Sequence, residues 1–137
     1  MIASAEEFVR LRTSINPDDY GRAASESATD AVWLTLVRNY PEMRFWVAQN
    51  KSIPLMALTL LATDPDVQVR CMVAMKRKLN PELFQLLAAD PDETVRHSIA
   101  CNAMTPRETL RRLTADPAEF VAEAARARIS RNPDLHR

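Results

Sequence analysis

The 137-residue sequence is long enough for one domain and short for two, and 47% of its residues are apolar, which allows a sizeable core. Basic and acidic residues balance at 18 each, so the net charge gives no general reason to expect a nucleic acid or an anionic membrane as the partner. One glycine beside nine prolines argues against glycine-rich hairpins and predicts an all-helical chain.

The N-terminal stretch 1–28 predicts two helices that lie outside the pattern found in the rest of the chain. Ser4 and Glu7 have the spacing of a capping box before a helix that carries Phe8 and Leu11. The stretch NPDDYGRAASES predicts a second, shorter helix. We interpret 1–28 as an N-terminal helical cap that covers the open end of a stack of repeats.

Neither the N-terminal stretch nor any other segment has an apolar run of the length that a signal peptide or a bilayer span needs. The expected location is therefore cytoplasmic, in a bacterial-type or a eukaryotic cell. The two cysteines, Cys71 and Cys101, do not form a disulfide framework by count or spacing, and we expect both to be reduced.

From position 29 onward the chain repeats itself with a period of 26. The phrase DPDVQVR at 64–70 returns as DPDETVR at 90–96 and as DPAEFVA at 116–122. The apolar columns in this register are Met43, Val69, Val95 and Val121; Val47, Val73, Ile99 and Ala125; and Leu61, Leu87 and Leu113. The first two columns are one helical turn apart, which places an apolar pair on one face of a helix. A companion helix precedes it, with leucines at helical spacing, so each copy consists of two short helices.

The boundaries of these helices are indicated by proline and aspartate. In DPDET we expect Asp90 to be the N-cap, Pro91 the first helical residue and Glu93 the third, and Asp64 and Asp116 to act in the same way. The first copy, about 29–53, lacks the Asp-Pro step and is degenerate. The final stretch RNPDLHR begins a further copy that does not continue, and we expect 134–137 to form an exposed tail. The junctions between copies are marked by prolines, namely Pro54, Pro81, Pro106 and Pro133.

The stretch LLAADPDETVRHSIACNAMTP resembles HEAT-like α-solenoid repeats, and is most similar to the leucine-rich repeat variant, over about positions 29–133. We interpret the whole chain, 1–137, as a single domain, and the resemblance implies that 29–133 form a right-handed α-solenoid of about four two-helix repeats. A period of 26 is well below the roughly 40 residues of HEAT units, so one helix of each pair is expected to have only one or two turns or to be a 3-10 helix.

The repeated arginine and aspartate predict a structural ladder. Within one copy they do not face each other on a helix, because their spacing places them on different sides of it. If the arginine of one copy reaches the aspartate of the next, the pairs are Arg44–Asp64, Arg70–Asp90 and Arg96–Asp116. This scheme also explains why the last copy, which has no successor, carries Ala122 in place of arginine.

The face opposite the apolar pair is the candidate partner-binding strip. Its members are Phe45, Gln49, Cys71, Met75, His97 and Cys101, with Trp46 and Met72 at its border. Aromatic, sulfur and imidazole groups are typical of adaptable protein-binding surfaces. The alternative is that these side chains only fill contacts between adjacent helices.

A metal site made by Cys71, His97 and Cys101 has three soft ligands but no fourth, and structural zinc takes four. We therefore predict no metal and no cofactor. A Cys71–Cys101 disulfide is not expected, because the two positions differ by one repeat and a further helical turn.

A second candidate surface is a basic edge formed by Lys51, Lys76, Arg77 and Lys78. Cations are favourable at helix C-termini in any case, because the macrodipole is negative there. The alternative interpretation is that the basic edge contacts an acidic protein or a phosphate group. HEAT-like relatives include DNA glycosylases that hold a duplex in a cationic groove, but those are longer and strongly basic.

The sequence does not predict a catalytic set of nucleophile, base and orienting group. Ser98 is adjacent to His97 and therefore faces another side of the helix, and His136 lies in the tail. The sequence thus predicts a monomeric, non-enzymatic protein-binding module, an adaptor or an inhibitor of the immunity type, whose partner is another protein. The alternative is a nucleic-acid-binding protein that uses the basic edge.

Overall fold

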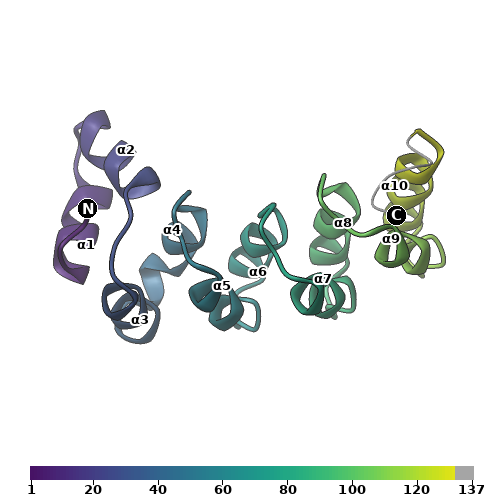
Figure 1. The fold of residues 1–137 in the computed structure, drawn as a ribbon, viewed down its shortest axis with the longest axis horizontal. Coiled ribbons are helices and arrows are strands. Elements are labelled where there is room, and N and C mark those ends of the chain that lie inside the picture. The colour runs from purple at the N-terminus through teal and green to yellow at the C-terminus, as the bar shows by residue number, and fades with distance from the viewer. Residues whose placement is uncertain (132–137) are drawn as a thin grey trace. The chain divides into compact units, whose positions relative to one another are not determined.

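A computed structural model describes residues 1–131 of the chain. These residues form ten α-helices and one 3-10 helix without a strand, apart from a single isolated parallel bridge between Ile2 and Ala28 (Figure 1). The all-α prediction is confirmed for this part of the chain. The predicted tail at 134–137, with His136, and the junction proline Pro133 lie outside the described residues.

The chain divides into two compact units, and the first comprises Met1–Asp64. Its helices are α1 (Ala5–Thr13), α2 (Pro17–Ser25), α3 (Asp30–Asn39), η1 (Pro41–Met43), α4 (Arg44–Gln49) and α5 (Leu55–Leu61). Helix α1 packs on α2 and α3, α2 packs on α4, and α3 packs on α5. The 3-10 helix η1 lies in the degenerate first copy, where no aspartate side chain caps the second helix.

The second unit begins at Pro65. Its helices are α6 (Val67–Ala74), α7 (Pro81–Ala88), α8 (Glu93–Cys101), α9 (Arg107–Leu113) and α10 (Glu119–Arg131). The second helices of successive copies contact one another in order, α6 with α8 and α8 with α10, and the first helices α7 and α9 do the same. Neighbouring copies in this unit therefore bury their apolar faces against each other.

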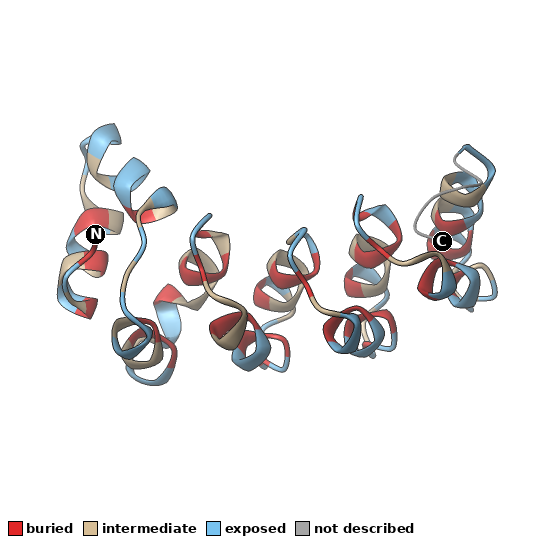
Figure 2. Cartoon of the chain, in the orientation of Figure 1, coloured by how far each residue is buried: buried red, intermediate tan, exposed pale blue. Residues whose placement is uncertain are grey.

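The apolar columns of the repeat form the cores of both units (Figure 2). Val69 and Val95 are 2% and 0% exposed, and every other member of the three predicted columns is also buried. The preceding helices contribute Leu58, Phe84 and Leu110. The periodic pattern therefore predicted the buried side of helices α4 to α10 correctly.

The N-terminal helices form as the sequence predicts, and α1 begins at the N-cap Ser4, with Glu7 bonded to the residue before the cap rather than to the cap itself. The Glu7 amide donates to Ser4 Oγ at 3.0 Å, and the Glu7 carboxylate accepts from the Ala3 amide at 3.2 Å. Phe8 is fully buried, with its ring edge-on to Trp33 at 6.0 Å. The second helix is not shorter than the first, because α1 and α2 each have nine residues.

The aspartates of the Asp-Pro step do not cap the helices, so this prediction was wrong. Helices α6 and α8 are capped by Asp66 and Asp92, which follow the proline and whose carboxylates accept from the amides of the second helical residue. Asp90 instead accepts from the Asp92 amide at 2.9 Å, which closes the turn before the helix. The same turn forms at Asp116, which likewise precedes the start of its helix. Around Pro91, therefore, each of the two flanking carboxylates accepts from the backbone amide two residues further along the chain.

The three predicted arginine–aspartate pairs are present. Arg70 Nε and Nη2 donate to the two carboxylate oxygens of Asp90 at 2.8 and 3.2 Å. Arg96 holds Asp116 in the same two-pronged way at 2.8 and 3.1 Å. In the first unit Arg44 makes a single, longer contact of 3.4 Å to Asp64.

These pairs are largely removed from water. The Arg70 and Arg96 side chains are 15% exposed and the partner carboxylates 6% and 5%. Burial opposes ionisation of Asp116, but the hydrogen bonds from Arg96 and the Ala118 amide outweigh it and hold the pKa of Asp116 below its ordinary value. At the end of the ladder Ala122 is buried in α10.

Replacing Arg70 by alanine should lower the free energy of unfolding by about 3 kcal/mol, because the Asp90 carboxylate remains buried without its partner. Urea unfolding monitored by circular dichroism measures this. The matched control is Arg126→Ala, which removes an exposed pair with Glu119 and should cost no more than about 1 kcal/mol. Equal stability of the two variants would contradict a stabilising ladder.

The last copy offers a second test, because alanine stands at the N-cap position before α10. Ala118→Asp should raise the free energy of unfolding by about 1 kcal/mol, since the new carboxylate can accept from an amide in the first turn, as Asp92 does in α8. Ala118→Asn separates the hydrogen bond from the charge and should retain most of the gain. A loss of stability in both variants would contradict the assignment of this position.

Candidate functional site

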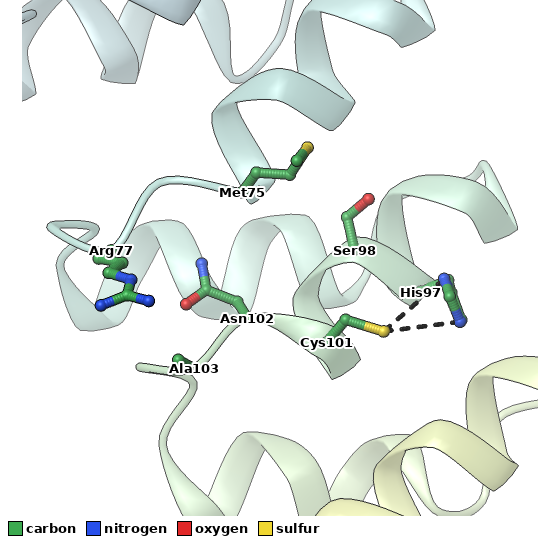
Figure 3. Close-up of a pocket in the computed structure, with 7 residues that line it drawn as sticks. All are labelled: Met75, Arg77, His97, Ser98, Cys101, Asn102 and Ala103. Carbon is green, nitrogen blue, oxygen red and sulfur yellow. Dashed lines mark hydrogen bonds between the residues drawn. The ribbon is translucent and has the colours of Figure 1, made fainter. Parts of the chain in front are cut away.

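The second unit contains a depression of about 330 Å³ beside the C-terminal ends of α6 and α8 (Figure 3). Helix α8 buries Val95 and Ile99, which turns His97 and Cys101 toward its open side. The residues that line the depression are Met75, Arg77, His97, Ser98, Cys101, Asn102 and Ala103. A cation, an imidazole, a thiol and a thioether therefore share one recess.

Two contacts fix the imidazole of His97. The Cys101 Sγ, one helical turn further along α8, lies 3.6 Å from Nε2 and 3.9 Å from Nδ1. The Phe120 ring of α10 lies 5.1 Å from the imidazole, tilted by 40°. Phe120 is itself 41% exposed, so it extends the apolar surface beyond the depression.

The depression carries positive and apolar groups. Arg77 is exposed at its wall, and no carboxylate belongs to the set of residues that line it. Met75 is 61% exposed. A ligand with a negative group next to an apolar one would match this lining.

Three of the six predicted strip residues meet here: Met75, His97 and Cys101. Cys71 does not line the depression, and its Sγ lies 3.6 Å from Thr94 Oγ1. Phe45 and Gln49 belong to α4 in the first unit, where the Phe45 ring stands perpendicular to Trp46 at 4.9 Å. A continuous strip across all six positions stays a prediction.

The predicted basic edge is unevenly exposed. Lys51 and Lys78 are exposed, but Lys76 is half-buried. Burial, assisted by the neighbouring charge of Lys78, lowers the pKa of Lys76 to about 8, and burial also lowers the pKa of Lys78. Arg77 lies at the depression. Lys76 therefore differs from a fully solvated, phosphate-seeking cation.

The floor of the depression depends on a polar column that the sequence analysis missed. Asn102 is 5% exposed, and its Nδ2 donates to the carbonyls of Ala74 and Lys76 at 2.8 and 2.7 Å. Its Oδ1 accepts from the Met104 amide at 2.8 Å. These bonds satisfy carbonyls at the C-terminal end of α6, which the helix itself leaves unpaired.

The same position repeats this role in other copies. Asn50, two periods before Asn102, donates to the carbonyls of Ala23 and Glu26 at 2.8 and 2.9 Å. Arg128, one period after Asn102, donates to the Asn102 carbonyl at 2.7 Å. In the sequence, this column could have been recognised because asparagine and a long cationic residue alternate at one position of the repeat. The column reads Asn50, Lys76, Asn102 and Arg128.

The structure offers no complete ligand set for zinc in residues 1–131, where no three His, Cys, Asp or Glu side chains gather. Cys71 does not join His97 and Cys101. Both cysteines are free thiols. Of the helices in this part of the chain, none has the length and apolarity that a bilayer span needs.

Comparison with known proteins finds no matching family model, no similar curated protein and no similar solved structure.

Lys76 should make stability depend on pH. Its folded-state pKa of about 8 lies below the ordinary value of 10.5, so between these values the unfolded chain binds more protons than the folded one. The free energy of unfolding should therefore rise as the pH increases from 8 to 10. It should fall by the same amount when the pH is lowered from 10 to 8. Urea unfolding at pH 7, 8, 9 and 10 measures the slope.

In this series Lys76→Met should flatten the rise, whereas Lys51→Met, at an exposed lysine, should leave it unchanged. A wild-type slope that persists in Lys76→Met would contradict the assignment.

Proposed function

We propose that this chain is a non-enzymatic protein-binding module, built as a right-handed α-solenoid of HEAT-like repeats, and that it binds its partner at the depression beside α6 and α8. The order of helix contacts in the second unit, α6–α8–α10 and α7–α9, supports the repeat architecture. The inter-copy pairs Arg70–Asp90 and Arg96–Asp116 support it as well.

The observation that carries the proposal is an exposed recess that combines adaptable apolar groups with a cation. Met75 is unbranched and polarisable, and Phe120 adds an aromatic edge next to His97. Arg77 supplies fixed positive charge in a lining without a carboxylate. The partner that fits is a protein segment in which an acidic side chain stands beside an apolar one.

The recess is held in place before binding. Asn102 ties the end of α6 to the turn after α8, and Arg128 donates to the carbonyls of Ala100 and Asn102 in that turn. A surface fixed in this way loses little conformational entropy when a partner docks. This property suits an adaptor or an inhibitor protein of the immunity type.

The contact between His97 and Cys101 pairs a nucleophile with a base, but a catalytic pair needs a third group that orients the imidazole. The adjacent Asn102 uses its amide for the Ala74 and Lys76 carbonyls and the Met104 amide. The other group packed on the imidazole is the apolar Phe120 ring. These contacts support a binding role over catalysis.

The test is quantitative capture. The tagged protein is used to isolate its partner from native lysate, the partner is purified, and its dissociation constant is measured by calorimetry. Met75→Glu should weaken binding at least 100-fold, because it places a carboxylate in a recess that is proposed to receive one. Leu86→Glu is the matched control: Leu86 is a 46% exposed apolar residue of α7 outside the depression, and binding should persist.

Nucleic-acid binding at the basic edge is the alternative outcome. It would appear as salt-dependent retention on duplex DNA that is lost in Lys78→Gln and unaffected by Met75→Glu. Unchanged protein binding in Met75→Glu, with the fold intact, would overturn the proposed site.

A further inference from the structure

A guanidinium held against aromatic rings marks a second candidate site, which lies in the first unit. Arg12 is in the last turn of α1, and its guanidinium carbon lies 3.4 Å from the centre of the Trp46 ring of α4 and 5.7 Å from that of the Tyr20 ring of α2. Three helices therefore contribute to one cation–aromatic cluster. We propose that this cluster is a docking site for an acidic segment of a partner protein, whose carboxylate is bound by Arg12.

The N–H donors of this guanidinium are not used by the described part of the chain. Arg12 Nε is buried and has no hydrogen-bond partner. Within residues 1–131 the two Nη groups make no hydrogen bond or ion pair either. By contrast, Arg22 on the neighbouring helix α2 bonds to Glu26 and lies 3.7 Å from Glu7. An acceptor brought by a partner would therefore satisfy donors of Arg12 that the fold leaves open.

The contact with Trp46 prepares Arg12 for this role. A guanidinium stacked on an aromatic ring loses water from one face and has less freedom to rotate, while its planar edge still matches a carboxylate. The helix dipole favours a cation in the last turn of α1, but this effect does not require the ring contact. Arginine and tryptophan are also the residues that most often dominate the binding energy of protein interfaces.

Apolar groups accompany the cation and indicate what the rest of the segment resembles. Tyr20 is 39% exposed, and Ile15, three residues beyond Arg12 in the turn that leads to α2, is 98% exposed. The half-buried Phe45 ring stands perpendicular to Trp46 at 4.9 Å. A segment in which acidic and apolar side chains alternate would bring a carboxylate to Arg12 and bury these groups.

Nucleic acid fits this site less well, because the same helices carry acidic groups. Helices α1 and α2 together hold four acidic and three basic residues, namely Glu6, Glu7, Asp18 and Asp19 against Arg10, Arg12 and Arg22. Arg22 is already paired with Glu7 and Glu26. A chain of phosphates would meet these carboxylates as well as Arg12, whereas one carboxylate needs only the single guanidinium.

The test is an NMR titration of the ¹⁵N-labelled chain with an acetylated and amidated peptide in which aspartate and leucine alternate. The signals of the Trp46 indole and of Arg12 Nε should shift and reach saturation. The same peptide with asparagine in place of aspartate should bind at least about 10-fold more weakly, because it lacks the charge that strengthens the hydrogen bonds. This comparison requires no substitution in the protein.

Variants then locate the contact. Arg12→Gln should weaken binding of the aspartate peptide at least about 10-fold, and Arg12→Lys, which keeps the charge but loses the planar fork, by about 3- to 10-fold. The matched control is Arg10→Gln, at a 64% exposed arginine in the same turn of α1, which should bind as wild type does. Circular dichroism and urea unfolding establish that each variant is folded.

Shifts that do not saturate, or equal affinity for the two peptides, would overturn the site. An equal loss of affinity in Arg10→Gln and Arg12→Gln would place the contact elsewhere. A single-stranded DNA oligonucleotide that binds at Trp46 more tightly than the aspartate peptide would contradict the choice of partner. The depression in the second unit contributes no residue to this test, so failure of the Arg12 site and failure of the proposed function are distinguishable.

Discussion

The architecture depends on an arginine that serves two copies of the repeat. Arg96 uses Nε and Nη2 for the carboxylate of the following copy, and its Nη1 donates to the Asp90 carbonyl of its own turn at 2.8 Å. Neither copy can move along the other without breaking one set of bonds in a site with little water. Because successive second helices are locked at a fixed offset, side chains at the same repeat position fall at regular places along the unit, and the recess beside α6 and α8 has a defined width.

The sequence could predict whatever is strictly periodic. The apolar columns that contain Val69 and Ile99 recur in every copy, and the ladder arginines in every copy but the last, so translation of a single helical pair placed them correctly. The N-caps were misplaced because Asp90 and Asp92 both flank Pro91, and only the actual start of the helix decides which carboxylate caps it. The Asn102 column was missed because its members alternate in chemical type, although Asn50, Asn102 and Arg128 all donate to backbone carbonyls of another helix end or turn.

Contacts between residues of different columns could not be predicted from the sequence either. The separation of His97 and Phe120 along the chain is not a multiple of the period, and they meet because α10 packs on α8. The same limit applies to the candidate strip. The pattern identified Met75, His97 and Cys101 as outward-facing, but their gathering around one recess follows from where α6 ends and the next turn begins. Side-chain orientation is local information, whereas a concave surface requires the packing of several helices.

The register of the ladder has a consequence for how such a chain changes length. Each ion pair joins an arginine to the aspartate of the next copy, so duplication or deletion of one whole copy leaves every remaining carboxylate matched with a guanidinium. An insertion shorter than a helical turn inside α6 or α8, ahead of the arginine, would turn that arginine around its helix and strand a buried carboxylate. A change in length by a full copy therefore preserves the ladder, while a short insertion inside one of these helices disrupts it.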